Sequence, residues 1–259
     1  MNIQHRESKS AGAGILVGRV VEIWRYPVQS MRGEQLPEIL VDGNGVPGDR
    51  EYGVVDPEIG EVVSAAQGKK KWRGIVTLSA RLLGEPVAGK LPAIEITLPD
   101  GATLRGDQAD IDARLSAFLE QPVHLAHRAT ENKRSSYSHE PLHILTTASL
   151  AAFQVQHAAG QFAPARFRPN IVIDTGDAGG FLEQGWLERK LQIGGGPRLA
   201  VTDNCKRCVM TTLPQGDLPF DPAILHTVNG ANRTWAGVYA GVSLSGTIKA
   251  GDSVFLLED

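Results

Sequence analysis

The chain has few cysteines, and this scarcity excludes several classes of protein. Its 259 residues include only two, Cys205 and Cys208. Two cysteines cannot build the disulfide framework on which small secreted domains depend. They also supply only half of the four ligands that a structural zinc ion usually takes, and no second pair with zinc-finger spacing exists beyond a loose His139 and His143.

Excess charge and long apolar runs are lacking as well. The formal net charge is -3, so no overall basic field attracts nucleic acid, and we expect no nucleic-acid partner. No apolar run approaches the roughly 20 residues that span a bilayer. The first fourteen residues have no apolar core of a secretory signal. We therefore expect a cytoplasmic protein without a membrane partner, in which a few local arginines or lysines hold any bound anion.

The first half of the chain alternates short β-prone runs with turns. Residues 15–26 form a β-rich run that ends at a proline, and residues 48–56 predict a second strand. Residues 93–106 alternate apolar and polar residues around a Pro-Asp-Gly turn, which predicts a hairpin. From Asp110 to Leu119, apolar residues recur at helical spacing, and Asp110 is available as an N-cap.

The second half follows a polar, charged segment at residues 128–140, which is the best candidate for a domain boundary. Residues 142–157 predict a strand and then a helix, with Thr146 or Thr147 placed to cap the helix. The last segment, 239–259, predicts two strands around a Gly-Asp turn. Further strands are predicted over residues 170–175, 189–194 and 198–203.

These elements predict an α+β, mainly β protein. Several short strands with glycine-rich turns favour a barrel in the second half. We expect a flexible tail at residues 1–14, an α/β region at 15–130, and a barrel-like domain at 131–259 on which that region packs.

The segment CKRC, residues 205–208, is compatible with several roles. A thioredoxin-like dithiol needs its first cysteine at a helix N-terminus, whereas the following VMTTLPQG is β-prone and lacks helical periodicity. Both thiols could equally be buried and inert. Lys206 and Arg207 between them would favour a thiolate, which suits a soft or intermediate metal. The residues alone leave these alternatives open.

Arginines and small polar residues recur in three other segments. YPVQSMRG presents Ser30 and Arg32, GDR presents Arg50, and FRPN presents Arg168 and Asn170 on either side of a proline that stiffens the backbone. The planar arginine fork suits phosphate, and an asparagine can bind the edge of a heterocycle. Each segment is equally compatible with an ordinary surface turn or a salt bridge.

Taken in order, YPVQS, GDR, HILTTASL, FRPNIVID, CKRCVMTT and GTIKAGDSVFLL resemble the MOSC family, the molybdenum cofactor sulfurase C-terminal domain proteins. The resemblance extends from about Val17 to the C-terminus and includes the MOSC N-terminal region. The pattern is most similar to the amidoxime-reducing and hydroxylaminopurine-detoxifying members. It implies a molybdenum cofactor, Mo-molybdopterin, between the two regions, with a cysteine thiolate on the metal.

The resemblance also implies the roles of particular residues. Cys208, the second cysteine of the pair, matches the metal ligand and catalytic residue. Gln29 stands where the family commonly has a lysine, so one cationic contact with the cofactor is missing unless Arg32 or the basic KKKWR segment replaces it. The expected cofactor-binding residues are Ser30, Arg50, Thr146, Thr147, Arg168, Asn170, Arg207 and Thr211.

The implied activity is the reduction of small N-hydroxylated compounds, namely hydroxylamines, amidoximes or N-hydroxylated bases. The chain has no iron–sulfur, flavin or haem motif, so electrons must come from a separate ferredoxin, flavoprotein or haem protein. One alternative is a carrier of cofactor or sulfur without turnover, with a persulfide on Cys208. A second is a cofactor-free domain with structural cysteines. The family association also implies pyridoxal phosphate binding.

Overall fold

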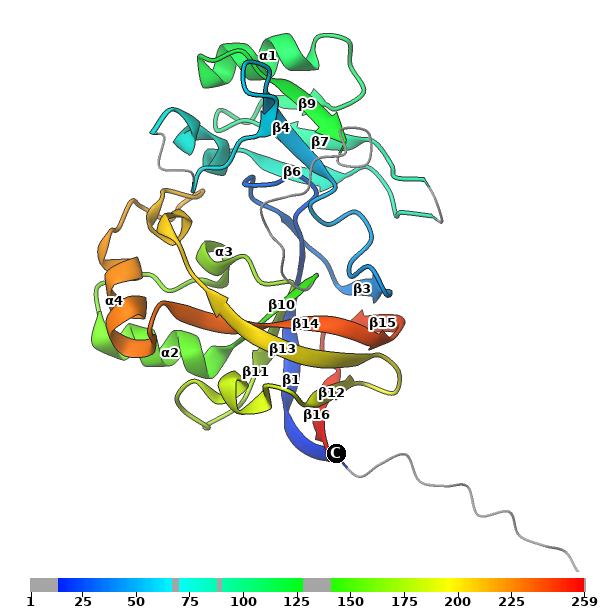
Figure 1. Ribbon diagram of the computed structural model, residues 1–259, viewed down its shortest axis with the longest axis vertical. Helices are drawn as coiled ribbons and strands as arrows, with labels where there is room; N and C mark the ends of the chain where they lie inside the picture. Colours follow the sequence, from blue (N-terminus) through cyan, green and yellow to red (C-terminus); the bar gives the residue numbers. More distant parts are fainter. Residues whose placement is uncertain (1–13, 67–69, 88–89, 128–140, 259) are drawn as a thin grey trace, which may run out of the picture.

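The computed structural model describes residues 14–66, 70–87, 90–127 and 141–258. These residues form two lobes, one above the other in Figure 1, with the C-terminal half in the lower lobe. The boundary expected at residue 130 and the tail expected at 1–14 lie outside the described residues, except for Gly14, which begins the first strand.

Seven strands of the largest sheet close into a ring, which we call the barrel (Figure 1). Neighbouring strands are antiparallel except for β10 and β11, which are parallel and are joined through helices. The pairing of β1 with β11 closes the ring. In order around it, the strands are β11 (Ile171–Asp174), β10 (Leu142–Thr146), β14 (Trp235–Leu244), β13 (Arg198–Lys206), β12 (Lys190–Ile193), β16 (Ser253–Leu257) and β1 (Gly14–Arg25).

The first strand belongs to the barrel of the second half. The sequence places residues 15–26 in the N-terminal region, yet β1 pairs with β16 through its first half and with β11 through its second. Val20 and Ile23 of β1 are completely buried in the barrel core. Local sequence could not show this, because the strand partners lie more than 140 residues away.

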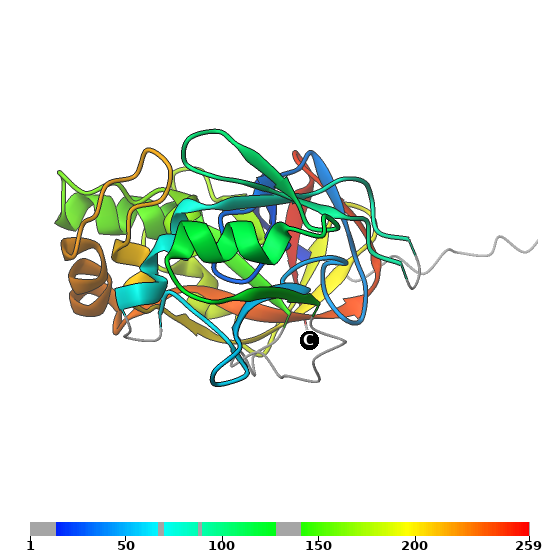
Figure 2. The same ribbon diagram turned by 90° about the horizontal axis from the view of Figure 1, so that it is seen from above.

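Helices cover one flank of the barrel. Helices α2 (Thr147–Gln156) and α4 (Ala223–Asn232) lie side by side there (Figures 1 and 2). Between them and the barrel, the Phe153 ring packs on Phe162 and Phe167, with centroids 5.7 and 6.1 Å apart. The hydroxyl of Thr146 accepts a hydrogen bond from the backbone amide of Ser149 at 3.2 Å, so the predicted cap of α2 is confirmed.

The N-terminal lobe contains two small sheets and a helix. The predicted hairpin and helix are confirmed as β7, β8 and α1, but Asp110 makes no side-chain cap hydrogen bond. Its φ and ψ of -98° and 4° lie outside the extended region that an N-cap normally adopts. The lobe comprises β4 (Tyr52–Asp56), β5 (Glu61–Val62), the 3-10 helix η1 (Lys70–Thr77), β6 (Ser79–Leu82), β7 (Ile94–Thr97), β8 (Thr103–Arg105), α1 (Ile111–Leu119) and β9 (His124–His127).

The C-terminal segment contains three strands rather than the two predicted. After β14, the chain leaves the barrel as β15 (Gly246–Lys249), which pairs antiparallel with β3 (Glu38–Val41). It then turns and re-enters the barrel as β16. The partner β3 comes from a distant part of the sequence, so the excursion depends on tertiary contact. The short strand β2 (Glu34–Gln35) pairs with the end of β1.

The residues after Cys208 are also not a strand. Val209–Thr212 form a single 3-10 turn, η3, for which Cys208 is the N-cap residue. Two other short helices are α3 (Pro164–Phe167) and η2 (Leu182–Trp186). Within the described residues, no helix has the length and apolar character needed to cross a membrane.

The place of β1 in the barrel can be tested by truncating one side chain. Ile23 is completely buried, so Ile23→Ala should lower the free energy of unfolding by about 2–5 kcal/mol through lost burial and the cavity left behind. Val21, on the same strand, is 40% exposed. Val21→Ala is the matched control and should cost under about 1 kcal/mol. Urea denaturation measures both, and equal losses would contradict the burial of β1.

Candidate functional site

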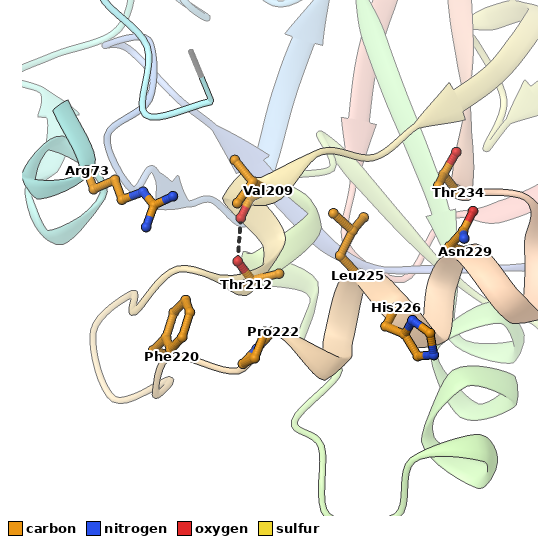
Figure 3. Close-up of a pocket in the computed structure, with 9 residues that line it drawn as sticks. All are labelled: Arg73, Val209, Thr212, Phe220, Pro222, Leu225, His226, Asn229 and Thr234. Carbon is orange, nitrogen blue, oxygen red and sulfur yellow. Dashed lines mark hydrogen bonds between the residues drawn. The ribbon is translucent and has the colours of Figure 1, made fainter. Parts of the chain in front are cut away.

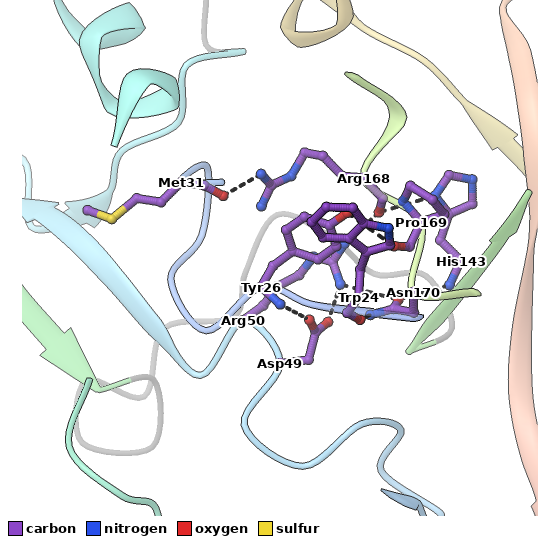
Figure 4. Close-up of polar contacts among 9 residues, drawn as sticks. All are labelled: Trp24, Tyr26, Met31, Asp49, Arg50, His143, Arg168, Pro169 and Asn170. Atoms are coloured by element: carbon purple, nitrogen blue, oxygen red, sulfur yellow. Dashed lines mark hydrogen bonds and ion pairs between the residues drawn. The ribbon is translucent and has the colours of Figure 1, made fainter. Parts of the chain in front are cut away.

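Segments that are distant in the sequence meet where β1 leaves the barrel (Figure 4). We call this place the junction, and define it by Tyr26–Met31, Asp49–Arg50, His143 and Arg168–Asn170. The backbone amide of Tyr26 donates to Asp49 Oδ1 at 2.7 Å, and the amide of Arg50 donates to the Tyr26 carbonyl at 2.7 Å. The turn that carries Arg50 is therefore bound to the end of β1.

Tyr26 lies at the centre of the junction. Its ring is buried, with the guanidinium of Arg168 4.3 Å and that of Arg50 5.1 Å from the ring centroid. Its hydroxyl donates to the Pro169 carbonyl at 3.1 Å. Burial raises the pKa of the Tyr26 phenol, although both arginines act in the opposite direction. The neutral ring is thus a cation–π platform that orients two cationic side chains.

Asn170 connects the same residues from the barrel side. Its Oδ1 accepts from the backbone amide of His143 at 3.1 Å and from Arg50 Nη1 at 3.5 Å. Its Nδ2 donates to the Trp24 carbonyl at 3.3 Å. Asn170 and Arg50, both expected to bind the cofactor, therefore lie together in the structure. Both polar atoms of the Asn170 side chain, however, already have protein partners.

Three residues of the junction have a left-handed backbone conformation, and one of them, Arg168, is the C-cap of α3. Seven non-glycine residues among those described have positive φ, and three of them are Ser30 at 68°, Arg50 at 55° and Arg168 at 55°. Such residues are commonly found at functional sites, where surrounding contacts hold them in place. Here Arg168 Nη1 donates to the Met31 carbonyl, and Arg50 Nη2 donates to the Arg168 carbonyl at 3.3 Å. Three residues assigned from sequence to one site thus share one strained cluster.

Cys208 lies between the barrel and the N-terminal lobe. It is half-buried and packs against a small apolar cluster formed by Ala65, Val76, Met210 and Leu213. Ser30 reaches the same segment, because its hydroxyl lies 3.4 Å from the hydroxyl of Ser64. Ser30 therefore contacts Ser64, the residue before the Ala65 that belongs to this cluster.

The predicted contact residue Thr211 has a structural partner in the turn after Cys208. Its hydroxyl donates to the Cys208 carbonyl at 3.0 Å and closes η3. Arg166, which is completely buried, holds this turn in place. Its guanidinium donates to the carbonyls of Thr211, Leu213 and Pro219 at 3.1, 3.3 and 2.8 Å. Sequence analysis missed Arg166, since a buried arginine that binds carbonyls has no local signature.

Cys205 has a different environment from Cys208. It is buried in β13, where Arg207 Nη1 donates to its sulfur at 2.6 Å, and Arg207 Nη2 donates to the Phe167 carbonyl at 2.6 Å. Burial raises the pKa of the Cys205 thiol, but Arg207 and His143 outweigh this effect and hold the pKa at about 6. The lowered pKa favours the thiolate form of Cys205, and Arg207 connects this sulfur to the turn that carries Arg168.

Thr146 and Thr147 are not brought to the junction. Thr146 lies opposite Ile173 in the β10–β11 ladder, whereas Asn170 precedes β11 at its other end. The Thr146 hydroxyl donates to the buried Glu183 at 2.6 Å, and the Thr147 hydroxyl donates to Asp174 at 3.0 Å. Two carboxylates at this helix N-terminus make it unfavourable for a phosphate.

Gln29, at the position of the family's usual lysine, and the nearby Arg32 have different surroundings. Gln29 is buried, and its backbone amide donates to the Tyr52 carbonyl at 2.8 Å. Arg32 extends toward the loop after η3, so that a Cβ at Gly216 would lie only 2.5 Å from Arg32 Nη1. Arg32 Nε is buried and has no hydrogen-bond partner within the described part of the chain. A cationic side chain with an unused donor is therefore present near η3.

Comparison with known proteins adds two family matches. The MOSC domain profile matches residues 120–255, and the MOSC N-terminal beta barrel domain profile matches residues 17–81. No curated protein matches the chain. The YuaD protein from Bacillus subtilis is structurally similar, with a TM-score of 0.51, 10% identity, and coverage of 93% of this chain and 97% of that chain. At this identity the likeness concerns the fold.

Two other solved structures are more distant. A hypothetical protein has a TM-score of 0.44 and 11% identity, with coverage of 93% of this chain and 68% of that chain. YiiM from Geobacillus stearothermophilus has a TM-score of 0.33 and 20% identity, with coverage of 46% of this chain and 55% of that chain.

The buried thiolate predicts a pH-dependent stability. A thiol whose pKa falls to about 6 on folding stabilises the native state fully at pH values above the pKa of the unfolded thiol. This stabilisation is lost as the pH falls through about 6. The excess stability of the wild type over Cys205→Ser should therefore grow by about 1–4 kcal/mol between pH 5.5 and pH 9. Urea titrations at several pH values measure this difference.

Arg207→Gln provides the second arm of the same experiment. Without the guanidinium that lowers the thiol pKa, the pH dependence attributable to Cys205 should shrink. A wild type whose advantage over Cys205→Ser stays constant from pH 5.5 to pH 9 would show that Cys205 is not a thiolate.

Proposed function

Because the chain belongs to the MOSC domain family, we propose that it is a molybdenum-cofactor-binding oxidoreductase that reduces small N-hydroxylated compounds. The cofactor association is a property of the family. The observation that carries the proposal for this chain is the group of Ser30, Arg50 and Arg168, all with positive φ, which joins both halves of the sequence next to the apolar cluster on which Cys208 packs.

The residues present fit such a cofactor. Molybdopterin carries a phosphate, for which Arg50 and Arg168 supply planar, positively charged groups, and of the two Arg50 is also ion-paired with Asp49. The buried Arg32 Nε, which has no described protein partner, offers a further donor on the same side of the molecule as η3. The half-buried Cys208 offers the soft sulfur that molybdenum accepts.

The scarcity of possible metal ligands in the described residues is consistent with a cofactor that itself supplies most ligands of the metal. The described residues contain no group of three or more His, Cys, Asp or Glu side chains able to hold a metal ion. A metal at Cys208 would therefore depend on the pterin for its other ligands. Every lysine in the described part of the chain is exposed, so the site offers no buried amine for pyridoxal phosphate, and the proposal is limited to the molybdenum cofactor.

Each residue of the site then has a distinct task. Cys208 holds the metal, while Arg50 and Arg168 bind the phosphate in an orientation set by the Tyr26 ring. The buried Arg166 keeps the Cys208 turn in position through the Thr211 carbonyl. When bound, the cofactor supplies the redox chemistry by which the N–O bond is reduced.

Electrons must come from another protein under this proposal. The chain has only two cysteines, too few for the four thiolates that usually hold an iron–sulfur cluster, and the sequence has no flavin or haem motif. A ferredoxin, a flavoprotein or a haem protein would serve as the donor.

Metal retention tests the assignment of Cys208. Wild-type protein from a host that makes the cofactor should contain about one molybdenum per chain, and Cys208→Ser should lose most of it. Cys205→Ser is the matched control and should retain the metal, because serine can still accept the hydrogen bond from Arg207. Mass spectrometry of the metal and fluorescence of the oxidised pterin measure the outcome.

Equal retention in both variants would remove Cys208 from the site. Loaded wild-type protein that reduces neither benzamidoxime nor hydroxylaminopurine with a competent donor would favour the alternative, a carrier of cofactor or sulfur.

A second pair of variants tests where the phosphate binds. Arg168→Gln removes a charged donor at the junction and should weaken cofactor retention about tenfold, as expected for a charge-assisted hydrogen bond. Thr147→Ala should leave retention unchanged, because its hydroxyl binds Asp174 at the other end of β11. Pterin content after gel filtration measures both. Loss in Thr147→Ala alone would place the phosphate at helix α2 instead.

A further inference from the structure

A cleft of about 490 Å³ lies on the flank of the molecule where η1 of the N-terminal lobe faces η3 and α4 (Figure 3). This volume is typical of small-molecule sites. The cleft contains none of the eight expected cofactor-binding residues, although Val209 directly follows Cys208 and Arg73 ends the basic KKKWR segment. Its lining residues are Arg73, Val209, Thr212, Phe220, Pro222, Leu225, His226, Asn229 and Thr234.

One wall of the cleft is held rigidly. The loop between η3 and α4 is tied by Arg166, which donates to the carbonyls of Leu213 and Pro219, and by the amide of Asp221, which donates to the Thr212 carbonyl at 2.9 Å. Phe220 lies between these attachments, yet its side chain is 56% exposed. An exposed aromatic ring on a fixed backbone is a preorganised surface for stacking, because little conformational entropy is lost when a ligand covers it.

The opposite side of the cleft supplies positive charge. Arg73 extends from η1 toward Val209 and Thr212 (Figure 3), and its guanidinium makes no hydrogen bond or ion pair with any other described residue. No acidic side chain is among the residues that line the cleft. An arginine available for a bidentate contact, with no competing carboxylate beside it, favours a carboxylate or phosphate group.

We infer that this cleft binds a planar aromatic compound that carries an acidic group. The ring packs between Phe220 and the apolar side chains of Leu225 and Val209, and the acidic group pairs with Arg73. The two groups on which ligand recognition depends, the Arg73 guanidinium and the Phe220 ring, belong to residues other than Cys208 and the arginines assigned to the cofactor phosphate. Failure of the inference would therefore leave the proposed molybdenum site untouched, and the reverse also holds.

Titration of the full-length, ¹⁵N-labelled, cofactor-free chain tests the inference, with benzoate as the probe. Benzoate should shift the amide resonances of Val209, Leu225 and Asn229. Benzyl alcohol, which has the ring without the charge, should bind at the same amides about tenfold more weakly, as expected for a lost charged hydrogen bond.

Two variants separate the contributions of charge and stacking. Arg73→Gln should weaken benzoate binding about tenfold and leave benzyl alcohol unaffected, whereas Phe220→Leu should weaken both about threefold. Arg114→Gln is the matched control, because Arg114 is an exposed arginine of the same lobe outside the cleft. It should bind benzoate like the wild type.

The inference is overturned if benzoate leaves the three cleft amides unshifted, or if Arg73→Gln and Arg114→Gln bind benzoate equally well. Comparison of benzoate with benzyl alcohol on the wild type needs no variant, so it decides the charge requirement even if a substitution impairs folding.

Discussion

Strand β1 pairs along one edge with β16 and along the other with β11, and most of the architecture depends on this double pairing. It closes the barrel and buries Val20 and Ile23 in the core. It also directs the chain out of the barrel at Tyr26, so that the loop with Ser30 meets Arg50 and the turn at Arg168. Without the closure, the residues of the two halves would have no common framework to hold them together.

The junction shows how a protein can bury positive charge without neutralising it by a carboxylate at every arginine. The Arg168 guanidinium stacks on the neutral Tyr26 ring and donates to the Met31 carbonyl. Carbonyls and an aromatic face stabilise a cation while leaving its net charge intact. An anion that arrives there meets a charged and oriented donor, which is the requirement for tight binding of a phosphate.

Buried arginines also set the geometry around the two cysteines. Arg166 fixes the backbone on both sides of the loop after η3, so one side chain organises the turn that follows Cys208 and the wall that carries Phe220. Arg207 bridges the Cys205 sulfur and the Phe167 carbonyl. The two sulfurs that look equivalent in CKRC therefore differ in role. Cys205 supports the framework, and Cys208 remains at the boundary between the lobes.

Elements whose signals are local could be predicted from the sequence. Apolar alternation and turn residues predicted the hairpin of β7 and β8, and a threonine before an apolar run predicted the cap of α2. The ordered motifs indicated the family, and Arg50, Arg168 and Asn170 do lie together. The lowered pKa of Cys205 could not be predicted in this way, because it depends on Arg207 and His143, which only the fold places beside the sulfur. The separation of Thr147 from the junction depends on strand direction, and the place of β1 depends on partners more than 140 residues away. Short-range propensity acts within a few residues, whereas pairing, burial and charge environment are decided by neighbours in space.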